Sequence, residues 1–384
     1  MGRLENYQYL KIFRDHLGND LNKVFNGEPI LPRQLEVHLP SDRKTACNFN
    51  CFYCQGGRVA RALGSWEEKG LTLMEKLQGR IPYYIYGGAY TEPLMNEFFP
   101  DYIKMTKKFN NHFGIHTNGS LFMALEEKNG FCSLLINEAN SSCDYVSTSL
   151  DAGTVESHKF TKKVKEDWFS KILEGLRILT KLRGRKKYPS IRVCYLMNKA
   201  NSSPKEIAGI VKIMQDIGVD SLRFSVPYDQ YGKDFKTVKV YRNKFEIPFG
   251  LKYHEVVKPY LSKDPLEKPY VFWHPPGYQD VEKMTFKQCV YTYYQITYAA
   301  DGYVYKCSST ASPSFGRNRL GKTTGDLDEF MAMVLANHNP DWDANTCFCS
   351  GARCNRIALE INEAWNKGTL NHEDLEDFTS SCGD

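Results

Sequence analysis

Residues 35–57 read LEVHLPSDRKTACNFNCFYCQGG and contain the stretch that decides the fold. LEVHL alternates apolar and polar side chains, as a short strand does, and the loop after it carries Cys47, Cys51 and Cys54. Three thiolates in this C-x3-C-x2-C spacing can converge on one metal centre. Structural zinc needs four protein ligands, and no nearby His or Cys supplies the fourth, whereas a four-iron cluster held by three thiolates leaves one iron open. A cluster with an open iron is the favoured interpretation, and it indicates a catalytic rather than a structural site. Zinc stays an alternative.

Strand-like runs recur after this one, and longer amphipathic stretches separate them. Six candidate strands lie between residues 35 and 228: LEVHL from Leu35, YYIYG from Tyr83, FGIHT from Phe113, YVSTSL from Tyr145, IRVCYLM from Ile191 and SLRFSV from Ser221. Such alternation is the signature of βα units around a parallel sheet. The sequence therefore predicts an α/β fold.

Two helical regions can be predicted in detail. Ser203 and Glu206 predict a capping box around Pro204 at the first helical position, and Gly218 predicts the end of that helix. Its apolar face is formed by Ile207, Ile210, Val211, Met214 and Ile217. Residues 154–182 are predicted to form a longer helical region that packs an apolar stripe into the core.

Composition limits the class of protein. The 384 residues are 42% hydrophobic and 25% charged, which are globular values. No apolar stretch is long enough to cross a membrane or to act as a secretory signal, so we expect a cytoplasmic protein without a membrane partner. Twelve cysteines are too few for a disulfide scaffold, and a net charge of +5 makes a nucleic-acid partner unlikely on charge grounds.

The cysteine loop resembles that of the radical S-adenosylmethionine (SAM) enzymes, which have C-x3-C-x-aromatic-C after the first strand. The resemblance implies a partial (β/α)6 parallel barrel and a [4Fe-4S] cluster on Cys47, Cys51 and Cys54, whose open iron binds SAM. One electron, from a donor of flavodoxin or ferredoxin type, then gives a 5′-deoxyadenosyl radical. Tyr53 corresponds to the aromatic residue near the adenine.

Other residues that resemble SAM-binding positions of the family lie at or near the ends of the later predicted strands. By resemblance, Gly87 and Gly88 belong to the turn that binds the methionine amino group, although Ala89-Tyr90-Thr91 displaces the acidic residue to Glu92. The same resemblance assigns SAM contacts to Thr117, Ser149 and Arg192, with Arg192 pairing the SAM carboxylate. Period-two alternation puts Cys194 on the same face as Arg192. Cys194 is then either a hydrogen donor to a substrate radical or a small buried packing residue, and we expect packing.

A second cysteine group follows residue 286. Cys289 precedes the stretch YQITYAADGYVYKC, which ends at Cys307 and predicts a hairpin turned at Asp301-Gly302. Cys347, Cys349 and Cys354 follow in C-x-C-x4-C spacing. The first half resembles the SPASM and Twitch extensions of radical SAM enzymes. Five or six thiols cannot fully ligate two cubanes, so one auxiliary [4Fe-4S] cluster is expected in a small α+β domain. Zinc stays an alternative here, and spacing does not decide between Cys347 and Cys349.

The expected division of the chain is an N-terminal helical extension (1–34), the barrel (35–228), a linker or substrate-facing insertion (229–285), the auxiliary domain (286–365) and a tail (366–384). The function expected first is an oxidoreductase that oxidises a carbinol of a small cyclitol or sugar-like molecule in biosynthesis. The 34-residue N-terminus favours it, because a leader-peptide recognition domain needs more residues. The alternative is crosslinking or epimerisation of a peptide substrate. An electron-transfer module without catalysis is disfavoured by the open-iron motif.

Overall fold

A computed structural model gives the arrangement of most of the chain. It describes residues 30–41, 47–54, 66–88, 91–226, 247–264, 266–274, 291–308 and 318–337, together with the single positions 23, 28, 311 and 367.

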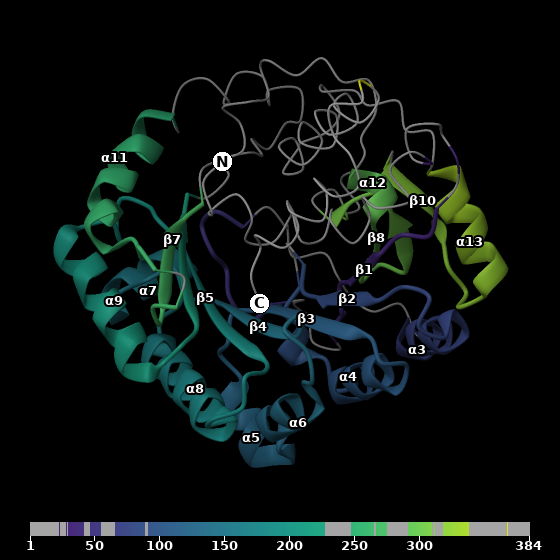
Figure 1. Cartoon of the computed structure of the whole chain (residues 1–384), viewed down its shortest axis with the longest axis horizontal. Coiled ribbons are helices and arrows are strands. Elements are labelled where there is room, and N and C mark those ends of the chain that lie inside the picture. The colour runs from purple at the N-terminus through teal and green to yellow at the C-terminus, as the bar shows by residue number, and fades with distance from the viewer. Residues whose placement is uncertain are drawn as a thin grey trace.

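One curved sheet runs through the described residues, with ten strands in the order β10-β9-β8-β1-β2-β3-β4-β5-β6-β7 (Figure 1). The strands are β1 (Gln34–Val37), β2 (Tyr83–Tyr86), β3 (His112–Thr117), β4 (Tyr145–Ser149), β5 (Ser190–Leu196), β6 (Ser221–Ser225), β7 (Tyr270–Trp273), β8 (Gln295–Tyr298), β9 (Tyr303–Tyr305) and β10 (Arg319–Lys322). Strands β1 to β7 pair in parallel. The predicted α/β fold with a partial parallel barrel is confirmed.

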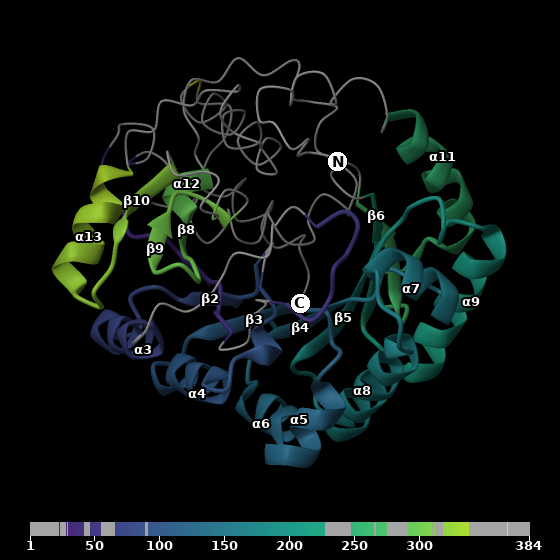
Figure 2. The same ribbon diagram turned by 180° about the vertical axis from the view of Figure 1, so that it is seen from behind.

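Helices cover the outer face of this sheet, and both views show them as an arc along it (Figure 2). They are α3 (Trp66–Leu77), α4 (Phe99–Lys108), α5 (Phe122–Asn129), α6 (Phe131–Glu138), α7 (Val155–Lys162), α8 (Trp168–Arg183), α9 (Pro204–Ile217), α11 (Ile247–Val257) and α13 (Leu327–Ala336). The short helix α12 (Tyr291–Tyr294) leads directly into β8, and two 3-10 turns are η2 (Pro93–Met95) and η4 (Lys258–Tyr260). None of the helices in the described ranges has the length and apolarity that a bilayer crossing requires.

Alternate residues of each strand pack under those helices. The buried core takes the outward-facing side chains of the strands, which are Leu35, Val37, Tyr84, Tyr86, Phe113, Ile115, Val146, Ile191, Val193, Tyr195, Leu222, Phe224, Val271, Trp273, Ile296 and Tyr298. Because side chains alternate along a strand, the residues between them face the barrel interior. This division places Glu36, His116, Ser147 and Arg192 inside the barrel, whereas Thr148 shares the outer face with Val146.

Helix α9 follows its sequence prediction closely, apart from one contact. The Ser203 side chain accepts a hydrogen bond from the Glu206 amide, Gly218 ends the helix in the left-handed conformation, and the predicted apolar face is buried. The return half of the predicted capping box is not formed. The Glu206 carboxylate instead accepts hydrogen bonds from the Gly153 amide, at 2.8 Å, and from the Ser157 hydroxyl, because these donors from the preceding βα unit lie within its reach.

The helical region predicted at residues 154–182 is two helices rather than one. Helix α7 ends at Lys162, and Lys163 takes a left-handed backbone conformation with φ of 51° before α8 begins at Trp168. Thr154 and Ser157 form a capping box that starts α7, and the Asp167 side chain caps α8. The break turns the end of α7 toward the cysteine loop.

Two findings lie in segments where the sequence indicated other arrangements. Strand β7 lies inside residues 229–285, the expected linker or insertion, and extends the parallel sheet beside β6. The hairpin predicted around Asp301-Gly302 is confirmed as β8 and β9, but β8 also pairs in parallel with β1. The start of the expected auxiliary domain therefore shares the barrel sheet, and the domain boundaries themselves remain predictions.

Candidate active site

The cysteine loop follows the carboxyl end of β1 and is fastened to the end of α7. The Asn50 amide donates to the Lys162 carbonyl at 3.1 Å, and the Phe52 amide donates to the Thr161 carbonyl at 3.2 Å. Within the loop, the Cys54 amide donates to the Cys51 carbonyl at 3.1 Å. These backbone bonds hold the loop at the edge of the sheet where a parallel barrel places its active site.

The three thiols offer the donor set that an iron–sulfur cluster needs. Cys47 and Cys51 are partly buried, Cys54 is exposed, and none of them is in a disulfide. The Cys47 sulfur accepts hydrogen bonds from the Phe49 amide at 3.4 Å and from Asn118 Nδ2 at 3.7 Å. Hydrogen bonds to cluster sulfurs are a usual feature of such sites. The chemistry of the donors and the spacing of the loop therefore fit the group.

The three thiols do not form a compact ligand group in this structure. Among the described residues, no three His, Cys, Asp or Glu side chains are gathered as metal ligands. Burial, then the charge of Glu92, raises the pKa of Cys47 to about 12, so this thiol is protonated without a metal. Metal binding releases such protons, and the three sulfurs would converge as a cluster binds.

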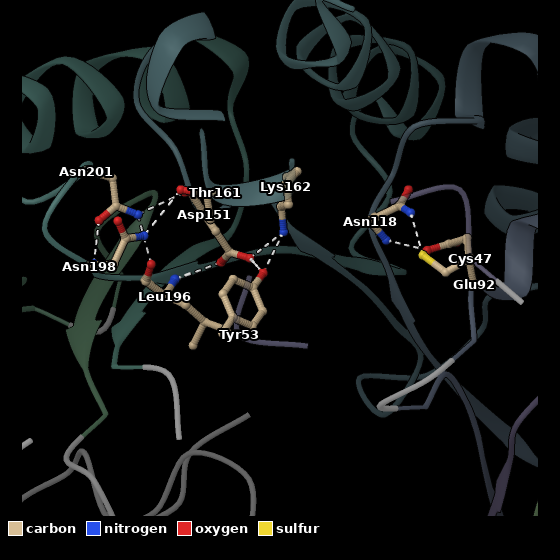
Figure 3. A network of polar contacts seen from close by, with 10 residues as sticks. All are labelled: Cys47, Tyr53, Glu92, Asn118, Asp151, Thr161, Lys162, Leu196, Asn198 and Asn201. Carbon is tan, nitrogen blue, oxygen red and sulfur yellow. Dashed lines mark hydrogen bonds and ion pairs between the residues drawn. The ribbon is translucent and has the colours of Figure 1, made fainter. Parts of the chain in front are cut away.

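Glu92 lies beside this loop, as the displaced acidic residue of the turn. Its carboxylate accepts hydrogen bonds from the Leu94 amide at 3.2 Å, the Asn118 amide at 2.7 Å and the Thr117 hydroxyl. Asn118 in turn donates to Cys47 (Figure 3). Glu92, Thr117 and the cysteine loop therefore meet at the end of β3. Burial raises the pKa of Glu92 to about 7.

Gly87 and Gly88 occupy positions where no larger residue fits. A Cβ on Gly87 would lie 2.8 Å from His116 Cβ, and one on Gly88 would lie 2.8 Å from His38 Cγ. Gly88 also has φ of +139°, a backbone conformation that other residues rarely adopt. The turn is therefore closely packed between two histidines. The Gly87 amide donates to the Val37 carbonyl at 3.3 Å, and the Gly87 carbonyl accepts from the Thr91 hydroxyl at 3.1 Å.

A buried ion pair, which sequence reasoning missed, supports Tyr53. The Tyr53 hydroxyl donates to Asp151, Lys162 Nζ lies 2.5 Å from Asp151 Oδ2, and Lys162 also donates to the Tyr53 oxygen at 2.8 Å (Figure 3). The side chains of Asp151 and Lys162 are 0% and 1% exposed. Burial alone would lower the pKa of Lys162, but Asp151 and the nearby thiols raise it. The sequence signal that could have indicated this site is the position of Asp151 directly after the predicted strand β4.

Asp151 is positioned by the neighbouring strand end. The Leu196 amide donates to Asp151 Oδ1 at 2.7 Å, and Asn201 Nδ2 donates to the Asp151 carbonyl at 2.8 Å. Ser149, the last residue of β4, lies opposite Cys194 of β5 in the sheet register. Ser149 is thus at the same edge of the sheet as the cysteine loop.

Arg192 lies lower in the barrel. Its Nε donates to Ser190 Oγ at 3.2 Å, and its guanidinium carbon lies 4.2 Å from the centre of the Tyr145 ring. Ser190 and Tyr145 are the first residues of β5 and β4, so Arg192 extends toward the amino-terminal strand ends and away from the loop after β1. Cys194 is 6% exposed on the interior face, and its sulfur lies 3.2 Å from Ser147 Oγ.

Of the expected auxiliary ligands, the structure describes Cys307. It follows β9 and is 9% exposed. Cys289, Cys347, Cys349 and Cys354 lie outside the described residues, so the auxiliary site stays a prediction.

Comparison with known proteins agrees with this arrangement. Residues 44–203 match the model of the radical SAM superfamily. Streptococcus suis SuiB bound to the precursor peptide SuiA has a TM-score of 0.56 at 14% identity, over 80% of this chain and 66% of the SuiB chain. The anSMEcpe structure with bound AdoMet and Cp18Cys peptide has a TM-score of 0.55 at 17% identity, over 85% and 88% of the two chains. No curated protein matches the sequence.

These solved structures are too distant in sequence to carry more than the fold. SuiB bound to S-adenosylmethionine also matches, with a TM-score of 0.55 and 12% identity over 88% of this chain and 71% of that one. The family match supports the expected cofactors, SAM and a [4Fe-4S] cluster, and the cysteine loop falls inside the matched residues. The match to the radical SAM superfamily covers residues 44–203, and the cysteine loop lies near its start.

Proposed function

We propose that this protein is a radical SAM enzyme that modifies a peptide by abstracting hydrogen from a C–H bond. The observation that carries the proposal is the juxtaposition of the cysteine loop with Glu92 and Asn118 at the carboxyl ends of the strands, inside the radical SAM domain. When bound, the cluster and SAM supply a 5′-deoxyadenosyl radical. The residues of this chain bind and orient both groups.

Cys47, Cys51 and Cys54 would hold the cluster. Glu92 presents a buried carboxylate that suits a cationic amino group, since a positive partner offsets the cost of burying its charge. Gly88 would offer its backbone groups in the same turn, where Gly87 is bonded to Val37 and Thr91. Tyr53 is held by Asp151 and Lys162, which fixes its ring next to the loop.

A peptide substrate is favoured over a small polyol. Both SuiB and anSMEcpe were solved with peptides, and the likeness to each covers at least four fifths of this chain, beyond the barrel itself. The expectation of carbinol oxidation depended on the short N-terminus. The proposal includes both crosslinking and epimerisation of the peptide, and a two-electron oxidation as in a dehydrogenase. It also includes one auxiliary cluster and an electron donor of flavodoxin or ferredoxin type.

The test is an anaerobic reaction of reconstituted enzyme, reductant and SAM with two substrate mixtures, a pool of synthetic peptides and a panel of cyclitols and sugars. We expect the peptides to raise 5′-deoxyadenosine formation above the rate without substrate and to change in mass or incorporate solvent deuterium. A loss of two mass units indicates crosslinking or dehydrogenation, and deuterium without other change indicates epimerisation. Stimulation by the polyols alone would overturn the peptide assignment.

A further inference from the structure

The interior face of the barrel carries charged and polar side chains below the cysteine loop. Strand registers pair His116 on β3 with Ser147 on β4, Ser147 with Arg192 on β5, and Cys194 on β5 with Arg223 on β6. Tyr145 on β4 and Glu36 on β1 face the same interior. Barrels that need only stability fill this space with branched apolar side chains. Ligand sites use a small number of placed polar groups to orient what they bind, and these side chains can supply such groups.

The acidic and aromatic members of this layer have identifiable partners. Glu36 Oε1 lies 2.8 Å from His38 Nε2, and Glu36 Oε2 accepts a hydrogen bond from Gln295 Nε2 at 2.8 Å. His116 Nε2 lies 2.9 Å from the Tyr145 hydroxyl, whose ring stacks under Arg192. Both oxygens of the Glu36 carboxylate are thus engaged on the β1 side of the barrel.

The charges on this face are unequal. Of the described residues of β1 to β8 that face the interior, Glu36 is the one carboxylate, while Arg192 and Arg223 bring two guanidinium groups on neighbouring strands. Burial, with the two arginines, lowers the pKa of His116 to about 4, so it is neutral near pH 7. Burial raises the pKa of Tyr145 above its ordinary value, so it too is neutral. Among these described strand residues, β5 and β6 contribute two cationic groups and no carboxylate.

We propose that Arg192 and Arg223 receive a carboxylate of the substrate, so that the peptide in the barrel presents an acidic side chain or its C-terminal carboxylate. This inference rests on the proposed function and names its substrate class. Arginine binds carboxylates with two parallel hydrogen bonds, and the stacking of Arg192 on Tyr145 fixes the plane of its guanidinium. The position of Arg192 near the first residues of β4 and β5 separates this group from the cofactor end.

The test measures peptide binding to the cluster-loaded enzyme with SAM, by anaerobic equilibrium dialysis. The probes are acetyl-Ala-Ala-Glu-Ala-Ala-amide, its Gln counterpart, and that Gln peptide with a free C-terminal carboxylate. We expect at least one carboxylate peptide to bind about tenfold or more tightly than the neutral one, a preference that Arg192→Met and Arg223→Met each remove. Arg192→Lys should retain part of it. Lys199→Met, which removes an exposed positive charge just beyond β5, should retain all of it.

Each contrary result overturns the inference in its own way. The inference is wrong if all three peptides bind equally or if neither carboxylate peptide binds. It is also wrong if the carboxylate preference survives in folded arginine variants. An approximately tenfold loss of SAM affinity in Arg192→Met would overturn it too, because Arg192 would then hold the cofactor. Peptide turnover without a carboxylate preference leaves the proposed function intact. Carboxylate binding that depends on the arginines, with no peptide turnover, removes the proposed function and leaves this site.

Discussion

Glu92→Gln should remove a pH dependence of stability that the wild type shows in the absence of SAM. The Glu92 carboxyl is buried, and its pKa is about 7, against 4.5 for an ordinary Glu. A carboxyl whose pKa is raised by folding contributes stability fully below pH 4.5 and loses that contribution as the pH rises through about 7. At roughly 1.4 kcal/mol per pH unit, the free energy of unfolding should fall by about 2 kcal/mol between pH 5.5 and 8.

The measurement is anaerobic urea denaturation of wild type and variant at pH 5.5 and pH 8, with equal iron content and no SAM. Gln keeps a neutral group at the site, so the wild type should lose about 2 kcal/mol more than the variant over this range. Glu97→Gln, two residues past η2 and exposed, is the matched control and should follow the wild type. Parallel pH profiles for wild type and Glu92→Gln would refute the raised pKa. Saturating SAM should also flatten the wild-type profile, because its amino group would favour the charged carboxylate.

Three further predictions concern packing and the auxiliary site. Lys162→Met leaves Asp151 buried without its cation and should lower the free energy of unfolding, measured with urea, by about 3–5 kcal/mol. The control Lys212→Met breaks an exposed pair and should lower it by under about 1 kcal/mol. Similar losses in the two variants would show that the Lys162 pair is not buried in solution. Gly114→Ala places a Cβ 2.4 Å from Tyr145 Cζ and should lower the free energy of unfolding by about 1–3 kcal/mol. The control Gly209→Ala, which has open space around it on α9, should raise that free energy. Equal effects of the two variants in urea denaturation would contradict the close packing at Gly114. Cys307→Ala should remove about four irons yet still form 5′-deoxyadenosine, because other elements hold the first cysteine group; full iron content by metal analysis would exclude Cys307 as a ligand.

Local sequence signals predicted the parts of the fold that local chemistry decides. Ser203, Pro204 and Gly218 fix α9 within the chain segment itself, so their prediction is confirmed. The break between α7 and α8 was missed because the predicted apolar stripe belongs to α8 alone. Helix α7 buries Ser157, His158, Thr161 and Lys162, which give no apolar periodicity to mark its end. Strand β7 was missed because its residues, Tyr270–Trp273, lie in a segment rich in Lys, Tyr and Pro that indicated a linker or insertion.

The candidate site divides in the same way. Spacing within one loop singled out Cys47, Cys51 and Cys54, and strand ends singled out Thr117 and Glu92, which the fold brings together. The alternation of side chains along β5 predicted that Arg192 faces the barrel interior. It could not predict toward which end of the strands the guanidinium extends, since that depends on the conformation of a long side chain. The partner of Asp151 lies eleven residues away across a helix, and only the tertiary structure pairs them.

The most direct test of the central claim compares Cys51→Ala with Cys143→Ala. Both remove one thiol, but Cys51 lies in the cysteine loop and Cys143 lies before β4, away from it. The purified enzymes would be reconstituted anaerobically, reduced, mixed with SAM, and assayed for iron and 5′-deoxyadenosine together. The account predicts that Cys143→Ala keeps the wild-type iron content and product, and that Cys51→Ala loses about four irons and all of the product. Wild-type levels of 5′-deoxyadenosine from folded Cys51→Ala, or none from the wild type with its cluster intact, would contradict it.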